Sequence, residues 1–393
     1  MSYKDIDQHA LNAPPAAERT VERLASYLAR PTQEPELVAR SIFRWITDRI
    51  TYGDNPCSHP QNGGDPTPEQ VLTHRRALCG GYARLFQALG AFSGLEVSLI
   101  PGHVKGRGYT IGRHFRGEGD HLWNGVRLGN SWGLVDATWG AGVVQGEGFK
   151  KELQDHYFLT PPKQMILDHY PDDPIWQLVE KPLSLTAFET SPIFKPPYFA
   201  LGLNAFEMSQ GTLEALSDFS TTIEAPPNVV LMAELWSRGR PLPRTLTFVQ
   251  QNAGRVIIHA RFPRPGTYIL RIYAKKTTEE RPFQWAMDYR LQSKRGWEEL
   301  PAFPEIFAAF GKERAQLLTP LAGRLKPGEK HHFRLIVPEA EEVVVTNNGT
   351  WETLNKEGQT FHGHSLVKKG HIAVVAKFPG EKSYPILLRY QGK

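Results

Sequence analysis

The feature that most constrains the fold is the stretch of residues 75–92, RRALCGGYARLFQALGAF. Its large apolar residues follow the i, i+3, i+4, i+7 spacing of a helix with one buried face: Tyr82, Leu85, Phe86, Leu89 and Phe92. This pattern places Cys79 where the helix begins. The free amide groups and the positive dipole end of a helix favour an anion, so we expect the Cys79 thiol to lose its proton readily. A lone cysteine on an apolar helix is more often an inert core residue, so a nucleophile needs further support.

That support comes from two predicted strands about forty residues downstream. The runs HLWNGVRLG and NSWGLVDATWG alternate in polarity, and Gly129-Asn130 between them is predicted to form a two-residue hairpin turn. The resulting register places Trp123 opposite Asp136. His121 and Asp136 then become diagonal neighbours on one face, roughly 5.5 to 8 Å apart, which is within reach of a His-carboxylate contact. A loop one residue longer or shorter would place them on opposite faces.

Together, these elements predict a Cys79, His121, Asp136 catalytic triad. In such a triad the carboxylate fixes the tautomer of the imidazole, and the imidazole holds and returns the proton of the thiol. His103 and His114 lie nearby in a glycine-rich segment, but neither has the strand context or the aspartate partner of His121. We therefore assign the base to His121.

The segments LCGGYARLF, HLWNGV and WGLVDATWGAG resemble the transglutaminase-like superfamily of papain-like enzymes. In that superfamily Cys, His and Asp occur in this order on a helix and two strands. The resemblance is strongest to the kyphoscoliosis peptidase branch, whose catalytic domain is followed by immunoglobulin-like modules, and residues 157–199 are similar to the connector of that branch. It implies that Cys79, His121 and Asp136 are the catalytic residues.

Two further residues are weaker candidates for the site. The resemblance implies a polar oxyanion-hole side chain from near the end of a helix predicted over residues 35–50, and Tyr52 is our candidate, beside the backbone N–H of Cys79. Trp139 is predicted to line the rim of the site, with ordinary packing as the alternative. The pair Ala-Leu precedes the cysteine, where the superfamily often has Gly-Val; this difference alters the approach to the sulfur but removes no catalytic group.

The rest of the N-terminal part is predicted from periodicity and turn residues. Residues 1–15 are expected to be an extended lead-in, and residues 17–30 a helix with one apolar face. The glycine-rich residues 102–120 are interpreted as a flap over the substrate groove, with a plain long hairpin as the alternative. We predict a catalytic domain over residues 1–160 and a connector over residues 161–199 that wraps it.

From residue 200 the chain changes to short β-like runs separated by Gly, Pro and Asn turns. The run ARFP at residues 260–263 recurs as AKFP at residues 376–379, an offset of 116 (376 − 260). This repeat predicts two β-sandwich domains, immunoglobulin-like in character, over residues 200–293 and 294–393. The predicted fold class is therefore an α+β papain-like, transglutaminase-like domain followed by two all-β immunoglobulin-like sandwiches.

Composition excludes several other classes. The chain has 393 residues, of which 40% are hydrophobic and 22% charged. This length and composition suffice for two or three domains, each with its own hydrophobic core. A net charge of +5 without a dense Lys/Arg block argues against a nucleic-acid partner. No apolar run of signal-peptide or membrane-spanning length occurs, so we expect no membrane association and a cytoplasmic location.

No metal or cofactor is predicted. Cys57 and Cys79 are the two cysteines, which excludes a disulfide framework and a CxxC zinc site. Cys57 and His59 could form a second catalytic pair or a metal site, but they lie in a proline-flanked loop without supporting partners. Five histidines near the C-terminus are interpreted as surface residues rather than metal ligands: His331, His332, His362, His364 and His371.

The predicted function is thiol-dependent acyl transfer on protein or peptide amides through a cysteine thioester, with a cysteine peptidase as the first choice. A protein-glutamine transglutaminase or deamidase is the alternative, because hydrolysis and transamidation share their first half-reaction. A peptide:N-glycanase is a third possibility, although the zinc-binding cysteines common in that family are missing. A catalytically silent scaffold that binds partners through its β-domains also stays open.

Overall fold

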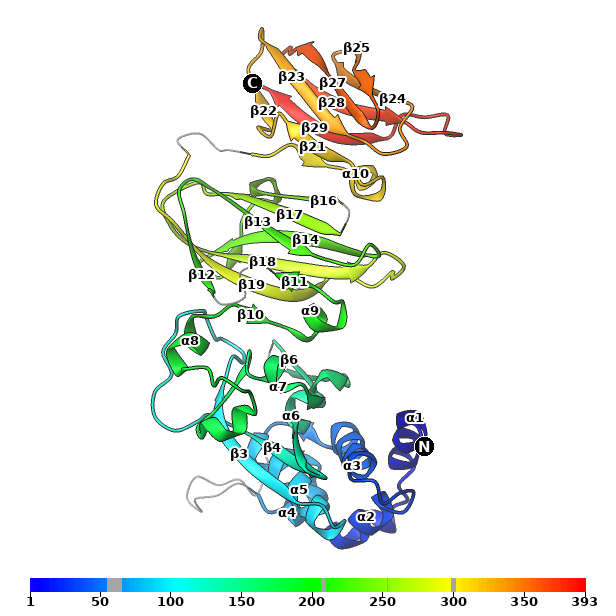
Figure 1. Cartoon of the computed structure of the whole chain (residues 1–393), viewed down its shortest axis with the longest axis vertical. Coiled ribbons are helices and arrows are strands. Elements are labelled where there is room, and N and C mark those ends of the chain that lie inside the picture. Colours follow the sequence, from blue (N-terminus) through cyan, green and yellow to red (C-terminus); the bar gives the residue numbers. More distant parts are fainter. Residues whose placement is uncertain (55–65, 147, 206–209, 253, 298–301) are drawn as a thin grey trace. The chain divides into compact units, whose positions relative to one another are not determined.

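The computed structural model describes residues 1–54, 66–146, 148–205, 210–252, 254–297 and 302–393. The contacts divide the chain into two compact units, Met1–Thr190 and Ser191–Lys393 (Figure 1). Cys57 and His59 lie outside the described residues, so the alternative site predicted for them has no structural counterpart to examine. No described helix is both long and apolar enough to cross a membrane.

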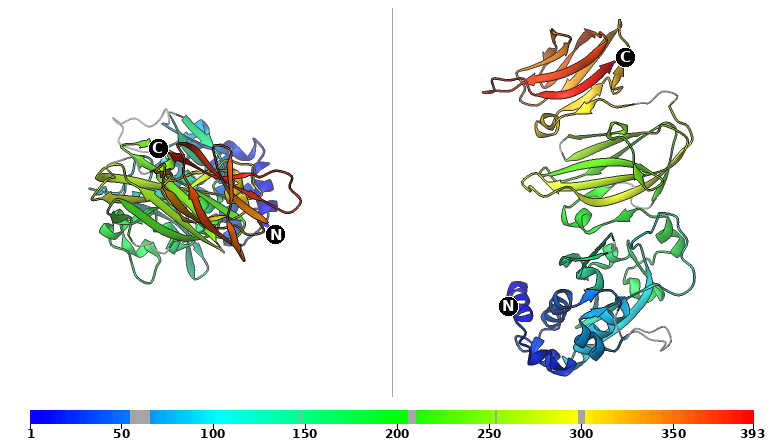
Figure 2. Two further views of the ribbon diagram at one scale, coloured as in Figure 1. Left: turned by 90° about the horizontal axis from the view of Figure 1, so that it is seen from above. Right: turned by 180° about the vertical axis from the view of Figure 1, so that it is seen from behind.

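Helices form one side of the first unit and a sheet forms the other, as Figure 1 and the back view of Figure 2 show. The main helices are α1 Tyr3–Leu11, α2 Val21–Leu28, α3 Pro35–Arg49, α4 Pro68–His74 and α5 Cys79–Phe92. Shorter helices are α6 Ala137–Gly140, α7 Pro162–Met165 and α8 Leu185–Thr190, and single 3-10 turns occur at Ala17–Arg19, Asp155–Tyr157 and Pro174–Gln177.

Helix α5 is central to this unit and begins at Cys79, as predicted. Tyr82, Leu85, Phe86 and Leu89 are all fully buried in the main core, together with apolar residues of α2 and α3. Phe92 was predicted to lie on the buried face of the helix. This prediction is wrong, because its side chain is 56% exposed. At 100° per residue Phe92 lies about 80° around the helix from Tyr82, at the edge of the buried face.

The first 15 residues are not an extended lead-in, which corrects that prediction. Helix α1 forms there, and its N-terminus is closed by a capping box in which Ser2 and Asp5 exchange side-chain and backbone hydrogen bonds. The helix buries Ile6 against the core. A tertiary contact also holds it, because the buried Arg40 guanidinium binds both carboxylate oxygens of Asp7, at 2.7 and 2.6 Å.

The sheet of the first unit has five strands in the order β8-β5-β4-β3-β9. The central hairpin β4-β5 pairs Leu128 with Ser131 and Asn124 with Val135, which is the predicted register. Gly129 has φ +60°, the left-handed value that the first central residue of a type II′ turn requires. The strands are β3 Val97–Val104, β4 His121–Leu128, β5 Ser131–Val135, β8 Phe158–Thr160 and β9 His169–Pro171.

The second strand of the hairpin is shorter than predicted. It ends at Val135, and Asp136 instead caps the first turn of α6 with its side chain. An aspartate followed by Ala-Thr-Trp provides an N-cap, so the local helix signal overrides continued strand pairing. Two small ladders complete the unit: β1 Thr51–Tyr52 with β2 Arg76–Ala77, and β6 Gly142–Gln145 with β7 Gly148–Lys151.

The glycine-rich residues 105–120 between β3 and β4 contain no helix or strand and are anchored by Glu189 of α8. The Glu189 carboxylate accepts hydrogen bonds from His114 Nδ1 at 2.8 Å and from the Phe115 amide at 2.6 Å. Its backbone carbonyl accepts from the Tyr109 hydroxyl at 2.7 Å. The segment is thus fastened at several points to a helix that comes much later in the chain.

The second unit contains two β-sandwiches of the same topology, each with its two sheets face to face (Figures 1 and 2). This agrees with the predicted immunoglobulin-like modules. The first sandwich consists of β10 Ile193–Phe194, β11 Asn204–Ala205, β12 Thr212–Ala215, β13 Asp218–Glu224, β14 Val229–Ser237, β15 Arg240–Pro241, β16 Thr247–Asn252, β17 Arg255–Arg261, β18 Gly266–Lys276 and β19 Gln284–Ser293, with α9 Pro196–Ala200 and a 3-10 turn at Arg244–Leu246.

The second sandwich consists of β20 Glu305–Ile306, β21 Gln316–Thr319, β22 Arg324–Leu325, β23 Lys330–Ile336, β24 Glu342–Asn347, β25 Thr350–Thr353, β26 Asn355–Glu357, β27 Thr360–Leu366, β28 Gly370–Lys377 and β29 Ile386–Gly392, with α10 Ala308–Lys312. The sheet orders β11-β13-β17-β16 and β21-β23-β27-β26 correspond strand by strand. The internal repeat is therefore real.

The predicted alignment of the repeat is wrong by one strand. The offset of 116 residues matched the end of β17 to the end of β28, whereas the topology makes β17 equivalent to β27 and β18 to β28. Alternating strands of similar composition resemble one another when shifted by a whole strand, because their period of two residues is the same. The four-residue motif shared by the ends of β17 and β28 favoured the shifted alignment.

Gly102 provides a test of how β9 docks onto the sheet. It pairs with Pro171, and a Cβ atom at this position would overlap the Tyr170 carbonyl oxygen and lie 2.6 Å from the ring of Trp123. We expect Gly102→Ala to lower the free energy of unfolding by about 3 kcal/mol, measured by urea denaturation. In the control, Gly106→Ala, the new Cβ would meet Val104 at an ordinary 3.6 Å, so little change is expected. Equal stability of both variants would show that β9 is not tightly docked.

Candidate active site

Cys79 is the first residue of α5, and its side chain is half-buried with a free thiol. No described side chain caps this helix end, so the first-turn amide groups stay available near the sulfur. Hydrogen bonds near its N-terminal end help to hold the helix in place. The buried Tyr82 hydroxyl donates to the Ile50 carbonyl at 2.8 Å, and the Asn124 amide of β4 donates to the Ala83 carbonyl at 3.1 Å.

His121 begins β4 and is buried beside Cys79. Its Nε2 lies 2.7 Å from Asp136 Oδ2, and its ring is also hydrogen-bonded to the Cys79 side chain. Since Nε2 is engaged by Asp136, Nδ1 is the nitrogen that faces the sulfur. Burial opposes the charged form of His121, but the carboxylate of Asp136 and the contact with Cys79 outweigh it and raise the pKa to about 10.

Asp136 is fully buried, and both of its carboxylate oxygens accept hydrogen bonds. Oδ1 accepts from the backbone amides of Thr138 at 2.7 Å and Trp139 at 3.0 Å, while Oδ2 accepts from His121. Burial alone would raise the pKa of Asp136. The charge and hydrogen bond of His121 and the hydrogen bond of a second histidine, His169, instead hold the pKa well below its usual value.

The three predicted triad residues are therefore brought together, although by a route that differs slightly from the prediction. Asp136 reaches His121 from the cap of α6, not from a continued strand.

The weaker candidates also lie near the triad. Tyr52 of β1 pairs with Ala77, two residues before Cys79. Burial, and then the charges of Cys79 and Asp136, raise the pKa of Tyr52, so its phenol keeps its proton at neutral pH. The ring of Trp139 lies 5.9 Å from that of His121 and is half-buried. The roles of Tyr52 as oxyanion donor and of Trp139 as rim residue stay predictions.

Sequence reasoning missed a second layer of polar residues behind the triad. His169 Nε2 lies 3.0 Å from Asp136 Oδ2, and its Nδ1 lies 2.6 Å from Asp168 Oδ1. The other oxygen of Asp168 accepts from the Tyr157 hydroxyl at 3.1 Å. The only local signal was the Asp-His pair in a segment interpreted as a connector, and nothing in it indicated that β9 returns to the sheet beside Asp136.

One group of potential metal ligands occurs among the described residues. The ligand atoms of His121, Asp136 and His169 all lie within 4.8 Å of one another. The contacts of Asp136 with the two rings, at 2.7 and 3.0 Å, have hydrogen-bond lengths, so a metal would have to displace them. We assign the group to a hydrogen-bond network.

In the C-terminal sandwich His332 and His364 are stacked cross-strand neighbours, at 4.8 Å between ring centroids.

Comparison with known families agrees with this geometry. Residues 22–137, which include Cys79, His121 and Asp136, match the model of the Transglutaminase-like superfamily. The chain carries a transglutaminase-like domain. Residues 185–304 match the KY-like, immunoglobulin-like domain, so the predicted resemblance and the predicted order of domain types are confirmed.

Several curated proteins are similar to the chain over more than half of its length. Human kyphoscoliosis peptidase is 30% identical over 280 residues, which cover 70% of this chain and 41% of that protein. The mouse protein of the same name is 32% identical over 243 residues, covering 61% of this chain and 36% of the relative. Drosophila melanogaster Hillarin is 29% identical over 232 residues, covering 56% and 28%. The chain spans less than half the length of each of these relatives.

The raised pKa of His121 predicts how the stability of the transglutaminase-like domain depends on pH. The pKa is about 10 in the folded protein against an ordinary 6.5, so the folded state retains a proton that the unfolded state has lost between these values. The stabilisation is complete below 6.5 and disappears as the pH rises through about 10. In urea unfolding, the wild type should lose more stability over this range than His121→Gln; parallel pH profiles would contradict the assignment.

Proposed function

We propose that the transglutaminase-like domain is a thiol acyl-transfer enzyme that acts on protein or peptide amides, with peptide hydrolysis as its principal reaction. The observation that carries this proposal is His121, held between the Cys79 side chain and the buried carboxylate of Asp136. Such an arrangement activates a thiol and supplies a proton to the leaving group. The proposed setting is the cytoplasm, which would keep the thiol reduced.

In the first half-reaction the Cys79 thiolate attacks the carbonyl carbon of the scissile amide and forms a C–S bond. The carbonyl electrons move onto oxygen, giving a tetrahedral intermediate. When the intermediate collapses, the C–N bond breaks, and the imidazolium of His121 transfers its Nδ1 proton to the leaving nitrogen. Asp136 stays ionised throughout, because its Oδ1 is held by two amides and its Oδ2 by ring N–H groups.

The developing oxyanion is stabilised by amide groups at the start of α5, beginning with that of Cys79. Tyr52 adds a hydroxyl donor, since its pKa is raised and the phenol remains protonated. Trp139 lines the rim and shields the His121 ring from water.

In the second half-reaction a nucleophile attacks the thioester carbon, and the neutral His121 accepts its proton. Water gives a carboxylic acid and regenerates the Cys79 thiolate; an amine gives a new amide instead, as in transglutaminases. The substrate is thus a protein or a peptide, and the β-sandwiches are proposed to bind protein partners or the substrate chain.

The reactivity of Cys79 tests this proposal without a known substrate. In a Cys57→Ser background, iodoacetamide should alkylate Cys79 quickly at about pH 6, well below the ~8.5 pKa of an ordinary thiol. The rate at this pH should fall by about 10-fold or more in His121→Ala, because the imidazolium partner is lost. Peptide hydrolysis should disappear in Cys79→Ala while the circular dichroism spectrum stays unchanged.

Slow alkylation in the wild type, with the steep pH dependence of a free thiol, would instead favour the silent scaffold. Hydrolysis that persists in Cys79→Ala would place the chemistry elsewhere. Replacement of water by an added primary amine as the acceptor would identify a transglutaminase.

Tyr52→Phe tests the proposed oxyanion donor. Loss of the hydroxyl should lower kcat by about 100-fold, the usual effect of removing one such donor, and leave alkylation of Cys79 almost unchanged. As a matched control, Tyr27→Phe removes a hydroxyl that binds the carbonyls of His9 and Asn12 in the N-terminal segment, and should retain the wild-type kcat. An unchanged kcat in Tyr52→Phe would show that the Tyr52 hydroxyl does not stabilise the oxyanion, so that backbone amides would be its only proposed donors.

A further inference from the structure

His169 is a second buried histidine in contact with the triad aspartate. It is the first residue of β9, the edge strand that pairs with β3, and its side chain is inaccessible to solvent. It follows Asp136 by 33 residues and lies beyond the region that matches the transglutaminase-like family model. In the proposed acyl-transfer steps it forms no bond to the substrate and transfers no proton.

The two hydrogen-bond partners of His169 support its protonated form. Nε2 lies 3.0 Å from Asp136 Oδ2, and Nδ1 lies 2.6 Å from Asp168 Oδ1. A neutral imidazole carries one N–H, so it would present a lone pair to one of two ionised carboxylates. Only the imidazolium donates to both. Burial lowers the pKa of His169, but the charge of Asp168 and the two hydrogen bonds outweigh it and raise the pKa.

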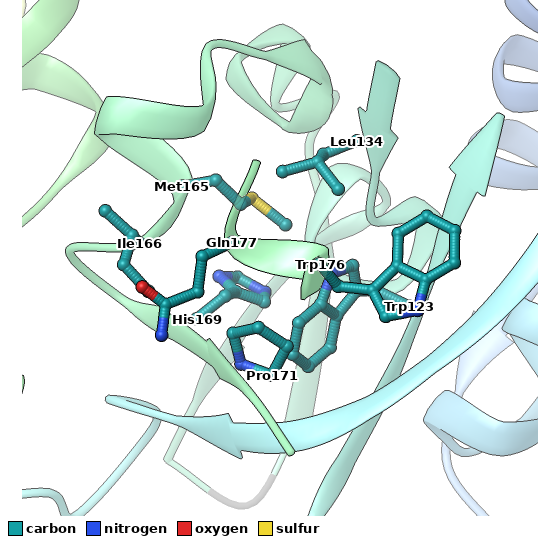
Figure 3. Close-up of a pocket in the computed structure, with 8 residues that line it drawn as sticks. All are labelled: Trp123, Leu134, Met165, Ile166, His169, Pro171, Trp176 and Gln177. Atoms are coloured by element: carbon teal, nitrogen blue, oxygen red, sulfur yellow. The ribbon is translucent and has the colours of Figure 1, made fainter. Parts of the chain in front are cut away.

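The pocket beside the His169 ring contains no water-sized space that would offer the ring another partner. Figure 3 shows the pocket beside its ring, lined mainly by apolar side chains that include Trp123, Met165 and Trp176, and too small to hold a water molecule. Its polar partners are thus the two carboxylates.

The charges around His169 balance one another. With both carboxylates ionised and both rings protonated, the group formed by Asp136, Asp168, His121 and His169 is neutral. Cys79 faces His121 in this group, and Tyr52 and Tyr82 face Asp136. The Tyr157 hydroxyl, which donates to Asp168, and the ring of His156 face Asp168 and His169. Burial raises the pKa of Tyr157 and lowers that of His156, so both stay uncharged at neutral pH.

This arrangement has two consequences for the triad. First, Oδ2 of Asp136 is shared between His121 and His169, so His169 holds the oxygen that orients the catalytic ring. Second, the ring centroids of the two histidines lie 5.6 Å apart. A positive charge at this distance in a buried site weakens the hold of His121 on its own proton. A base held too strongly by Asp136 would be a poor proton donor to the leaving amine.

We infer that His169 is a positively charged positioning residue, which fixes Asp136 Oδ2 and makes His121 a stronger acid than Asp136 alone would allow. This inference rests on the proposed acyl-transfer function, because it concerns the proton that His121 delivers. It extends the functional unit beyond the three triad residues to β9 and to Asp168.

The test compares pH profiles of Cys79 alkylation in the Cys57→Ser protein, from about pH 4 to about pH 11. The wild-type profile should show two transitions, for formation of the Cys79–His121 ion pair and for loss of the His121 proton. In His169→Gln the amide can still donate to Asp136 but carries no charge. Both transitions should therefore move to higher pH, by about one unit.

His169→Phe removes the donor as well as the charge. It should show the same shift and in addition about a 10-fold lower rate on the ion-pair plateau, because Asp136 loses a charge-assisted hydrogen bond. His103→Gln is the matched control. His103 is a buried histidine of the adjacent strand β3, 3.8 Å from Asp120, and it does not contact the triad. Its profile should coincide with that of the wild type.

A profile of His169→Gln that coincides with the wild type, or a lower rate without a shift, would overturn the inference and reduce His169 to a packing residue. A wild-type profile with no ion-pair transition would instead contradict the proposed function itself. The two failures are thus distinguishable.

A measurement on the unmodified protein avoids any dependence on how well the variants fold. In long-range ¹H–¹⁵N spectra both ring nitrogens of His169 should carry protons at neutral pH. One protonated and one bare nitrogen at neutral pH would identify the neutral ring and contradict the inference.

Discussion

The carboxylate of Asp136 is the group on which the site depends. It is fully buried, yet it stays ionised because two amides at the start of α6 bind one oxygen and two histidines bind the other. A buried carboxylate without these donors would take up a proton and lose its hold on His121. In the proposed mechanism, the orientation of His121, and through it the activation of the Cys79 thiol, follows from how this charge is accommodated.

The fold supplies these donors from elements far apart in the chain. The hairpin β4-β5 provides His121 and leads directly into the cap of α6, which accounts for the short separation of the base and its aspartate. Helix α5 brings Cys79 from the other side and is fastened to β4 by Asn124. The edge strand β9 then closes the network with His169, and the close approach at Gly102 allows this strand to dock.

Much of this arrangement could be predicted from the sequence, since helix α5 and the hairpin are encoded by local periodicity and by the Gly129 turn. The backbone conformation at Asp136 could not be predicted, because a helix cap and a continued strand compete within the same few residues. His169 was missed for another reason: its partners are set by long-range strand pairing, which leaves no periodic signal in a proline-rich segment. Helix α1 was also not predicted. It is stabilised by a capping box and by a tertiary contact with Arg40, and a tertiary contact cannot be read from local periodicity.

The most direct test of the central claim is burst kinetics with p-nitrophenyl acetate, which needs no knowledge of the natural substrate. If Cys79 forms an acyl-enzyme activated by His121, the Cys57→Ser protein should release about one p-nitrophenol per chain in a burst, followed by slower turnover. The burst should be absent from Cys79→Ala and strongly slowed in Asp136→Asn. A burst of the same size and rate in Asp136→Asn would contradict the account, because the sulfur would then react independently of the buried carboxylate.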